Sequence, residues 1–258
     1  MKRYQYNYTT RIDFSENVYR HHFLLRCSPG KYDFQKILEE NITILPEGSI
    51  TKGKDNFGND VFSGYIGGFH NYFEFKVNGI IEQDFYCISE ELNPVYCYPS
   101  KLTMPMKNIQ NLLENTDIPV KAKIIDKVSI LSHKLFASLN YESGITSIET
   151  TAEHALELGK GVCQDYSHAL IALCRKVGIP ARYVAGFMLG EGLTHAWIEF
   201  YDEGKWYGFD PTHDKPINSG FIKIAHGRDY TDCAIHKGVF TGMTQQNLDV
   251  FLKVEEQQ

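Results

Sequence analysis

The 258-residue sequence lacks the features that mark membrane, secreted and nucleic-acid-binding proteins. No apolar run approaches the roughly 20 residues of a membrane helix, and no apolar core follows Lys2 and Arg3 as it would in a secretory signal. The formal net charge is −6 and no basic cluster is present, which argues against nucleic acid as the main partner. We therefore expect a cytoplasmic protein that binds neither membranes nor nucleic acid.

The cysteines and histidines give little support for a metal site or a disulfide scaffold. No Cys-x-x-Cys pair is present, and six scattered cysteines in a chain of this length fit a reducing compartment. His21 and His22 fall in a predicted strand, where adjacent side chains point to opposite faces and cannot easily chelate one ion. We therefore expect no metal and no cofactor. The cysteines are Cys27, Cys87, Cys97, Cys163, Cys174 and Cys233.

The first hundred residues predict β structure. Tyr4, Tyr6 and Tyr8 alternate with polar residues, as in a half-buried strand, and residues 73–77 repeat this alternation. Short strands with turns between them indicate a small all-β sandwich or barrel. Proline-containing turns then mark a change of pattern, so we place an N-terminal β-rich domain at residues 1–98.

Residues 99–258 predict an α+β core with a C-terminal β tail. Apolar residues first recur at helical spacing, and shorter strand-like segments follow Pro180. Helices followed by a hairpin of strands are the order of an α+β fold. The predicted helices span 120–140, Thr150 or Thr151 to 158, and 163–177, and the predicted strands span 182–189, 194–201 and 206–210.

Cys163 lies in the first turn of the third predicted helix. Free backbone N–H groups and the helix dipole favour negative charge there, and so favour a thiolate. A lone cysteine on a helix is more often a packing residue, so its chemistry depends on the partners that later segments of the chain supply. We expect Asp165 to serve the helix dipole rather than catalysis, His168 to lie off the site, and Cys174 to pack in the core.

The last two predicted strands form a hairpin whose geometry can be derived from the sequence. If Tyr201 pairs with Trp206, then Asp210 faces Trp197 and is the diagonal neighbour of His195 on the same face. A register slip of one residue would move Asp210 to the other face. The alternative is that Trp197 merely packs His195 and that Asp210 forms a turn before Pro211.

Four segments of the second half of the chain stand in a distinctive order and spacing. They are Gly-Val-Cys-Gln-Asp-Tyr-Ser-His (161–168), Gly-Ile-Pro-Ala-Arg-Tyr-Val (178–184), Thr-His-Ala-Trp-Ile-Glu (194–199) and Gly-Phe-Asp-Pro-Thr (208–212). Taken together, they resemble the transglutaminase-like superfamily, and are most similar to its bacterial cysteine-protease branch. Residues 1 to about 90 also look like the β-rich N-terminal domain of that branch, and residues 227–230 and 238–240 look like its C-terminal tail. The resemblance implies an α+β core with helices packed on an antiparallel sheet.

The resemblance implies a papain-like core with a Cys-His-Asp triad. In it Cys163 is the nucleophile, His195 the base and Asp210 the partner that orients the base. The backbone N–H of Cys163 is expected to supply one oxyanion donor, because a helix N-terminus presents it. The second donor and the cleft wall stay open, and their candidates are Tyr141, Gln164 and Trp197, the last of which either walls the cleft or packs under the imidazole.

The expected function is cleavage of an amide or peptide bond in a peptide or protein substrate, through a covalent acyl-enzyme. Transglutaminase-type transfer to an amine and a non-catalytic binding module with an idle triad are the alternatives. Arg182 and Arg228 could hold a substrate carboxylate, although structural ion pairs are the more common role of such arginines. Asp229 and Tyr230 suggest a supporting role in the core, which the sequence does not define.

Overall fold

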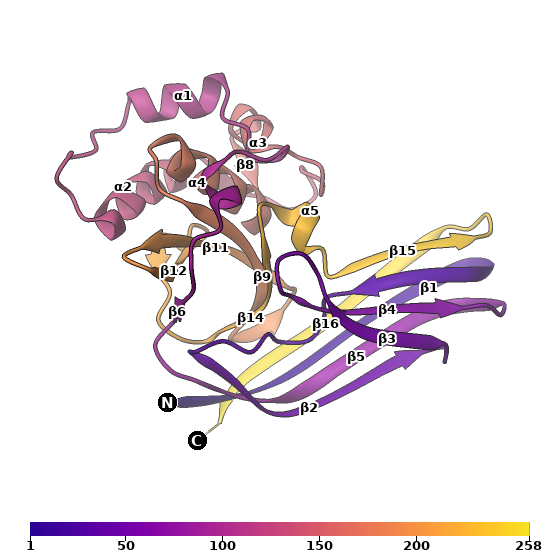
Figure 1. Cartoon of the computed structure of the whole chain (residues 1–258). Coiled ribbons are helices and arrows are strands. Elements are labelled where there is room, and N and C mark those ends of the chain that lie inside the picture. The colour runs from indigo at the N-terminus through magenta and orange to yellow at the C-terminus, as the bar shows by residue number, and fades with distance from the viewer. Residues whose placement is uncertain (258) are drawn as a thin grey trace.

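The structure is a computed structural model and describes residues 1–257. A long, curved β-sheet extends from one side of a compact head of helices and strands (Figure 1). The two ends of the chain lie side by side, because Arg3 pairs with Gln257. No helix in the described residues is long and apolar enough to cross a membrane.

The extended sheet is a half-barrel of eight strands built around β1 (Lys2–Leu25). The alternation of the first strand places Tyr4, Tyr6 and Tyr8 in the core, each 3% exposed or less. This arrangement confirms the predicted all-β N-terminal region, although as one curved sheet. The other strands are β2 (Gln35–Leu45), β3 (Ser49–Lys54), β4 (Asp60–Ile66), β5 (His70–Gln83), β10 (Gly190–Gly192), β15 (His236–Thr241) and β16 (Gln246–Gln257).

The C-terminal tail joins the N-terminal sheet in space. Both β15 and β16 pair with β1, so residues 236–257 complete the half-barrel. Conversely, β6 (Cys87–Ser89) precedes residue 98 in the sequence but pairs with β12 (Lys205–Asp210) of the head. The boundary at residue 98 stays a prediction, but strands from each side of it pair in the sheet of the other half.

The head is the predicted α+β core. Its antiparallel sheet runs in the order β13-β12-β11-β9-β14, and α4 packs on β11 and β9. The aliphatic residues of α4 form one core cluster with Ile198 and Phe200 of β11. The bounds are β9 (Ala181–Met188), β11 (His195–Asp202), β12 (Lys205–Asp210), β13 (Lys215–Pro216), β14 (Phe221–Gly227) and α4 (Cys163–Lys176).

The smaller elements correct the helix predictions in two places. The helix expected over 120–140 is α2 (Ile124–Phe136), because the chain turns at Ala137 and enters a strand at Asn140. α1 (Lys107–Glu114) is a helix that we did not predict, whereas α3 (Ala152–Leu158) begins as predicted after Thr151, whose side chain accepts the His154 N–H. The remaining elements are η1 (Pro94–Cys97), β7 (Asn140–Tyr141), β8 (Lys160–Gly161) and α5 (Tyr230–Cys233).

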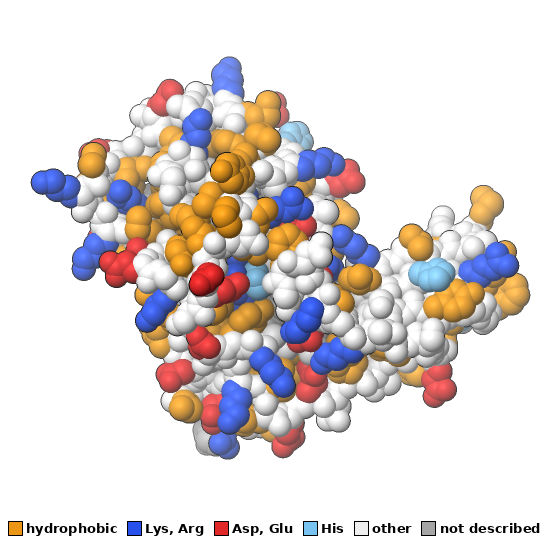
Figure 2. Space-filling view, viewed as in Figure 1, with side chains coloured by type: hydrophobic (Ala, Val, Ile, Leu, Met, Phe, Trp, Pro, Cys, Tyr) orange, Lys and Arg blue, Asp and Glu red, His pale blue; other side chains and the backbone are white. Residues whose placement is uncertain are grey.

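The surface carries charges of both signs. On the face drawn in Figure 2, Lys and Arg side chains lie among Asp and Glu, and hydrophobic side chains gather over the helical part of the head. This mixture is what a chain with a net charge of −6 and no basic run predicts.

Candidate active site

Cys163 is the first residue of α4, and a buried carboxylate shapes the turn that presents it. Asp165 accepts hydrogen bonds from the backbone N–H of Val162 (2.8 Å) and from the Thr146 hydroxyl (2.7 Å). Burial raises the pKa of Asp165, and these two hydrogen bonds oppose the effect. Asp165 therefore caps the start of the helix, in line with the predicted helix-terminal role.

Gly161 is required by the same turn. A Cβ atom at Gly161 would lie 2.6 Å from the Cβ of Asp165 and 2.8 Å from its Oδ2. The backbone of β8 therefore passes so close to the capping carboxylate that only glycine fits. The sequence Gly-Val-Cys-Gln-Asp thus specifies the local geometry of the thiol as well as its identity.

The hairpin has the predicted register and brings His195 to Asp210. Tyr201 pairs with Trp206, and the ladder continues to Ile198 opposite Phe209. The Nε2 atom of His195 lies 3.0 Å from Oδ2 of Asp210. Asp210 is fully buried, and its Oδ1 accepts the N–H of Thr212 at 2.9 Å. The carboxylate is therefore held from both sides and orients the imidazole.

The charges of the site favour a protonated imidazole. Burial alone lowers the pKa of His195, but the hydrogen bond with Asp210 and the interaction with the Cys163 sulfur outweigh it and raise the pKa to about 9. Burial of the Asp210 carboxyl raises its pKa, but the interactions with His195 and, to a smaller extent, with His213 hold this pKa below its ordinary value. This arrangement therefore stabilises a charged His195 imidazolium beside the Asp210 carboxylate.

His213 is a site residue that the sequence reasoning missed. Its Nδ1 atom lies 2.7 Å from Oδ2 of Asp210, the same oxygen that bonds His195. Ligand-type atoms of His195, Asp210 and His213 lie within 4.8 Å of one another, but both imidazoles are hydrogen-bonded to the carboxylate, so the cluster is held together by its own hydrogen bonds. The spacing Asp-Pro-Thr-His was the available signal, because a turn after β12 returns a side chain three residues later to the carboxylate.

The three further candidates occupy different positions. Tyr141 is 59% exposed in β7, which pairs with β8 directly before Cys163, and it lines the cleft. The amide nitrogen of Gln164 donates to the Ser147 carbonyl oxygen (3.3 Å), so it is engaged away from an incoming substrate. Trp197 is fully buried and stacks 6.3 Å from the His195 ring, so it packs under the imidazole rather than walling the cleft.

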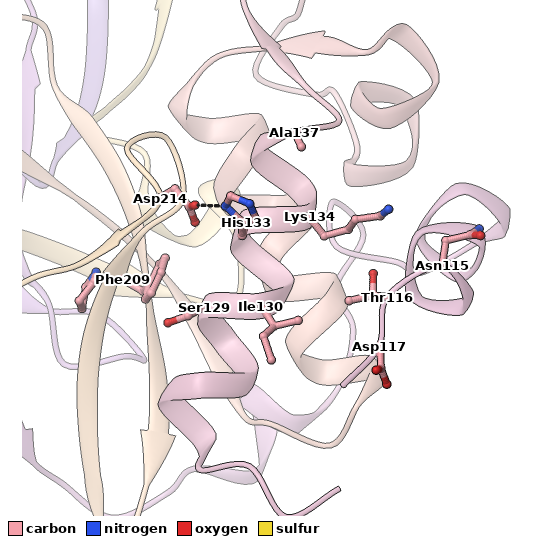
Figure 3. A pocket seen from close by; sticks show the side chains of 11 residues that line it. Asn115, Thr116, Asp117, Ser129, Ile130, His133, Lys134, Ala137, Phe209 and Asp214 are labelled. Atoms are coloured by element: carbon pink, nitrogen blue, oxygen red, sulfur yellow. Dashed lines mark hydrogen bonds and ion pairs between the residues drawn. The ribbon is translucent and has the colours of Figure 1, made fainter. Parts of the chain in front are cut away.

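A cleft of about 540 Å³ opens beside His195 and His213. A second pocket of about 690 Å³ is lined by α2, by residues 115–117 after α1, and by Phe209, Asp214 and Pro216 at the loop that follows β12. Figure 3 shows His133 of α2 facing Asp214 of this loop across a hydrogen bond. The loop therefore has the triad on one side and the second pocket on the other. The first cleft is lined by Phe136, Leu139, Asn140, Tyr141, Tyr166, Met188, His195, Thr212 and His213.

Other residues singled out in the sequence have structural contacts. Arg182 is fully buried and pairs with Glu199, and Arg228 pairs with Asp232, so both arginines are engaged within the protein. His168 is buried and accepts the backbone N–H of Tyr230 at 3.1 Å. In addition, Asp229 caps α5 by accepting the Thr231 N–H, and Cys174 is a fully buried core residue.

Comparisons with known proteins match both halves of the chain. Residues 111–211 match the family described as "Transglutaminase-like superfamily", and residues 4–82 match the "Bacterial transglutaminase-like N-terminal region". An uncharacterized protein of Mycobacterium leprae is 38% identical over 128 residues, which is 46% of each chain. An uncharacterized protein of Mycobacterium tuberculosis is 30% identical over 151 residues, covering 52% of this chain and 48% of that protein. The chain thus spans a little under half the length of these relatives.

A solved structure shares the whole architecture. The crystal structure of a "Putative Cysteine Protease" from Cytophaga hutchinsonii superposes with a TM-score of 0.81 over 99% of this chain and 90% of that one. Its sequence identity is 23%, so the likeness shows the fold alone.

Proposed function

Because the chain belongs to the transglutaminase-like superfamily and carries its bacterial N-terminal region, we propose that it is a thiol enzyme that cleaves an amide or peptide bond through a covalent acyl-enzyme. The observation that carries the proposal is the hydrogen bond of His195 with Asp210, whose atoms lie 3.0 Å apart. The Cys163 sulfur also raises the pKa of His195, and His195 lines a cleft. The proposed substrate is a peptide or protein, and the expected compartment is the cytoplasm.

The first half of the reaction forms a thioester. The Cys163 thiolate attacks the carbonyl carbon of the substrate, and the C–N bond then breaks as the His195 imidazolium gives its proton to the leaving amine. The N–H of Cys163 has no backbone acceptor within residues 1–257, so it is available to bind the oxyanion. The exposed hydroxyl of Tyr141 is the better of the two candidates for the second donor.

The second half releases the product. Neutral His195 removes a proton from water, the hydroxyl attacks the thioester carbonyl carbon, and the acid leaves as the C–S bond breaks. The proton that His195 gained re-forms the imidazolium beside the Cys163 thiolate. Asp210 accepts hydrogen bonds throughout and keeps Nε2 of His195 protonated, which leaves Nδ1 for the thiol and the substrate.

The decisive experiment follows both fates of the acyl-enzyme at once. Casein is incubated with the protein and a fluorescent primary amine, and new peptide ends and amine incorporation are measured in parallel. The proposal predicts new ends in wild type, little incorporation, and neither product in Cys163→Ser. Incorporation without new ends would instead identify amine transfer. Neither product, together with an unreactive Cys163, would identify a non-catalytic module.

A further inference from the structure

The Asp210 carboxylate serves two imidazoles. Its Oδ2 atom lies 3.0 Å from Nε2 of His195 and 2.7 Å from Nδ1 of His213. An ionised carboxylate can only accept hydrogen bonds, so both ring nitrogens donate to the same oxygen. Asp210 is fully buried, whereas the His213 side chain is 42% exposed, so His213 covers the carboxylate from the solvent side.

The residue after His213 fixes the loop to the helix layer. Oδ1 of Asp214 accepts the Ser132 hydroxyl at 2.6 Å, and its Oδ2 bonds Nδ1 of His133 at 2.8 Å (Figure 3). Asp214 has a φ angle of +49°, in the left-handed region that aspartate tolerates better than most residues. Contacts from two consecutive α2 residues therefore hold the backbone in a conformation that few sequences adopt.

We propose that His213 is a positioning residue, which Asp214 holds in place through α2, and which shares the Asp210 carboxylate with His195. The proposal rests on the proposed function, because it assigns His213 a role in the same triad. Sharing one oxygen between two donors weakens each bond. His213 therefore keeps the His195 imidazolium a good enough acid to protonate the leaving amine.

The charged and titratable groups around His195 come from each neighbouring element. They are Asp210 of β12, Cys163 of α4 and His213 of the loop, and His213 in turn is followed by Asp214, which bonds His133 of α2. Without the His213 donor, the hydrogen bond between Asp210 and His195 is no longer shared, and the negative charge of Asp210 acts more strongly on His195. The imidazolium should then hold its proton more tightly.

The test uses a matched pair of variants and nuclear magnetic resonance of ¹⁵N-histidine-labelled protein. His213→Phe keeps a ring over the carboxylate but removes the donor, whereas the amide of His213→Asn keeps a donor near the position of Nδ1. We expect the titration midpoint of His195 to rise by about one pH unit in His213→Phe and to stay near wild type in His213→Asn. Equal midpoints in all three proteins, or equal shifts in both variants, would overturn the role of the donor.

A second pair protects the test against misfolding. Asp214→Gly keeps the left-handed backbone but loses both contacts with α2, whereas Asp214→Asn keeps an acceptor for Ser132. We expect a smaller upward shift in Asp214→Gly than in His213→Phe, and none in Asp214→Asn; no shift in Asp214→Gly would refute the anchoring. The initial burst of nitrophenolate release from p-nitrophenyl acetate, measured in wild type, separates the proposed function from the proposed role of His213. No burst refutes the proposed function, whereas a burst with unshifted midpoints refutes only this inference.

Discussion

Gly161→Ala offers a sharp test of how the nucleophile is held. The new methyl group would lie 2.6 Å from Cβ and 2.8 Å from Oδ2 of Asp165, well inside van der Waals contact. Asp165 must then move, and it gives up the bonds with the Val162 N–H and the Thr146 hydroxyl. The lost cap and the overpacking together should lower the free energy of unfolding by about 2–4 kcal/mol.

The assay is equilibrium unfolding in urea, with reactivity of Cys163 toward iodoacetamide measured in parallel. Gly68→Ala is the matched control, because a Cβ there has no heavy atom within 4 Å, and its cost should be under about 0.5 kcal/mol. The free energy of unfolding of the protein and the reactivity of Cys163 should both fall in Gly161→Ala. Both should stay close to wild type in the control.

A double-mutant cycle identifies the cause. The three atoms nearest the new methyl group all belong to Asp165, so Asp165→Gly removes the obstacle. In that background the further cost of Gly161→Ala should fall to under about 1 kcal/mol. If the two costs simply add, the close approach of Gly161 and Asp165 is not what constrains this turn, and the reasoning is refuted.

Two further predictions concern buried charge. The pKa of His195 is about 9, above its unfolded value of about 6.5, so its charged form stabilises the fold fully below pH 6.5 and this contribution is lost as pH rises through 9. Between these limits wild type should lose up to about 3 kcal/mol more stability than His195→Gln, and parallel pH–stability curves would contradict this. Glu199→Gln should cost about 3–5 kcal/mol, because it leaves Arg182 and Lys223 buried without their shared carboxylate. Asp232→Asn, in a pair whose arginine side chain is 44% exposed, should cost under about 1 kcal/mol in the same urea titration, and similar costs for both variants would argue against the buried network.

The local geometry of the site could be predicted because short-range rules decide it. The assumed pairing of Tyr201 with Trp206 and strict side-chain alternation placed Asp210 beside His195, and the observed register is the predicted one. The pairing also extends to Asp202 and Lys205, so the observed turn has two residues. The helix that begins at Cys163 followed from the apolar spacing, and Thr151, one of the two predicted caps, is the observed cap of α3. In each case the determining residues lie no more than 15 positions apart.

The parts that were missed depend on contacts between distant segments. β1 is one strand of 24 residues, because β5 and β16 pair with its first part and β4 and β15 pair with its last part. The sequence pattern instead suggested separate strands around Tyr6 and around His21. α1 packs on α3 and α4 but spans only eight residues, so its apolar pattern covers about two turns, too few for a clear helix prediction. His213 was missed because its role depends on a loop that α2 anchors from about 80 residues away. Propensity and alternation carry no information about such contacts.

The central claim is that Cys163 is a nucleophile activated by His195. The most direct test is the rate of iodoacetamide alkylation, measured at each cysteine by peptide mass spectrometry across a pH series in wild type and His195→Ala. Cys97 is the internal reference, because it is a free, exposed thiol, whereas Cys163 is only partly exposed. The account predicts that Cys163 reacts faster than Cys97 near neutral pH in wild type, and that His195→Ala removes this advantage. If Cys163 reacts no faster than Cys97, or if His195→Ala leaves its rate unchanged, the thiolate–imidazolium pair does not exist.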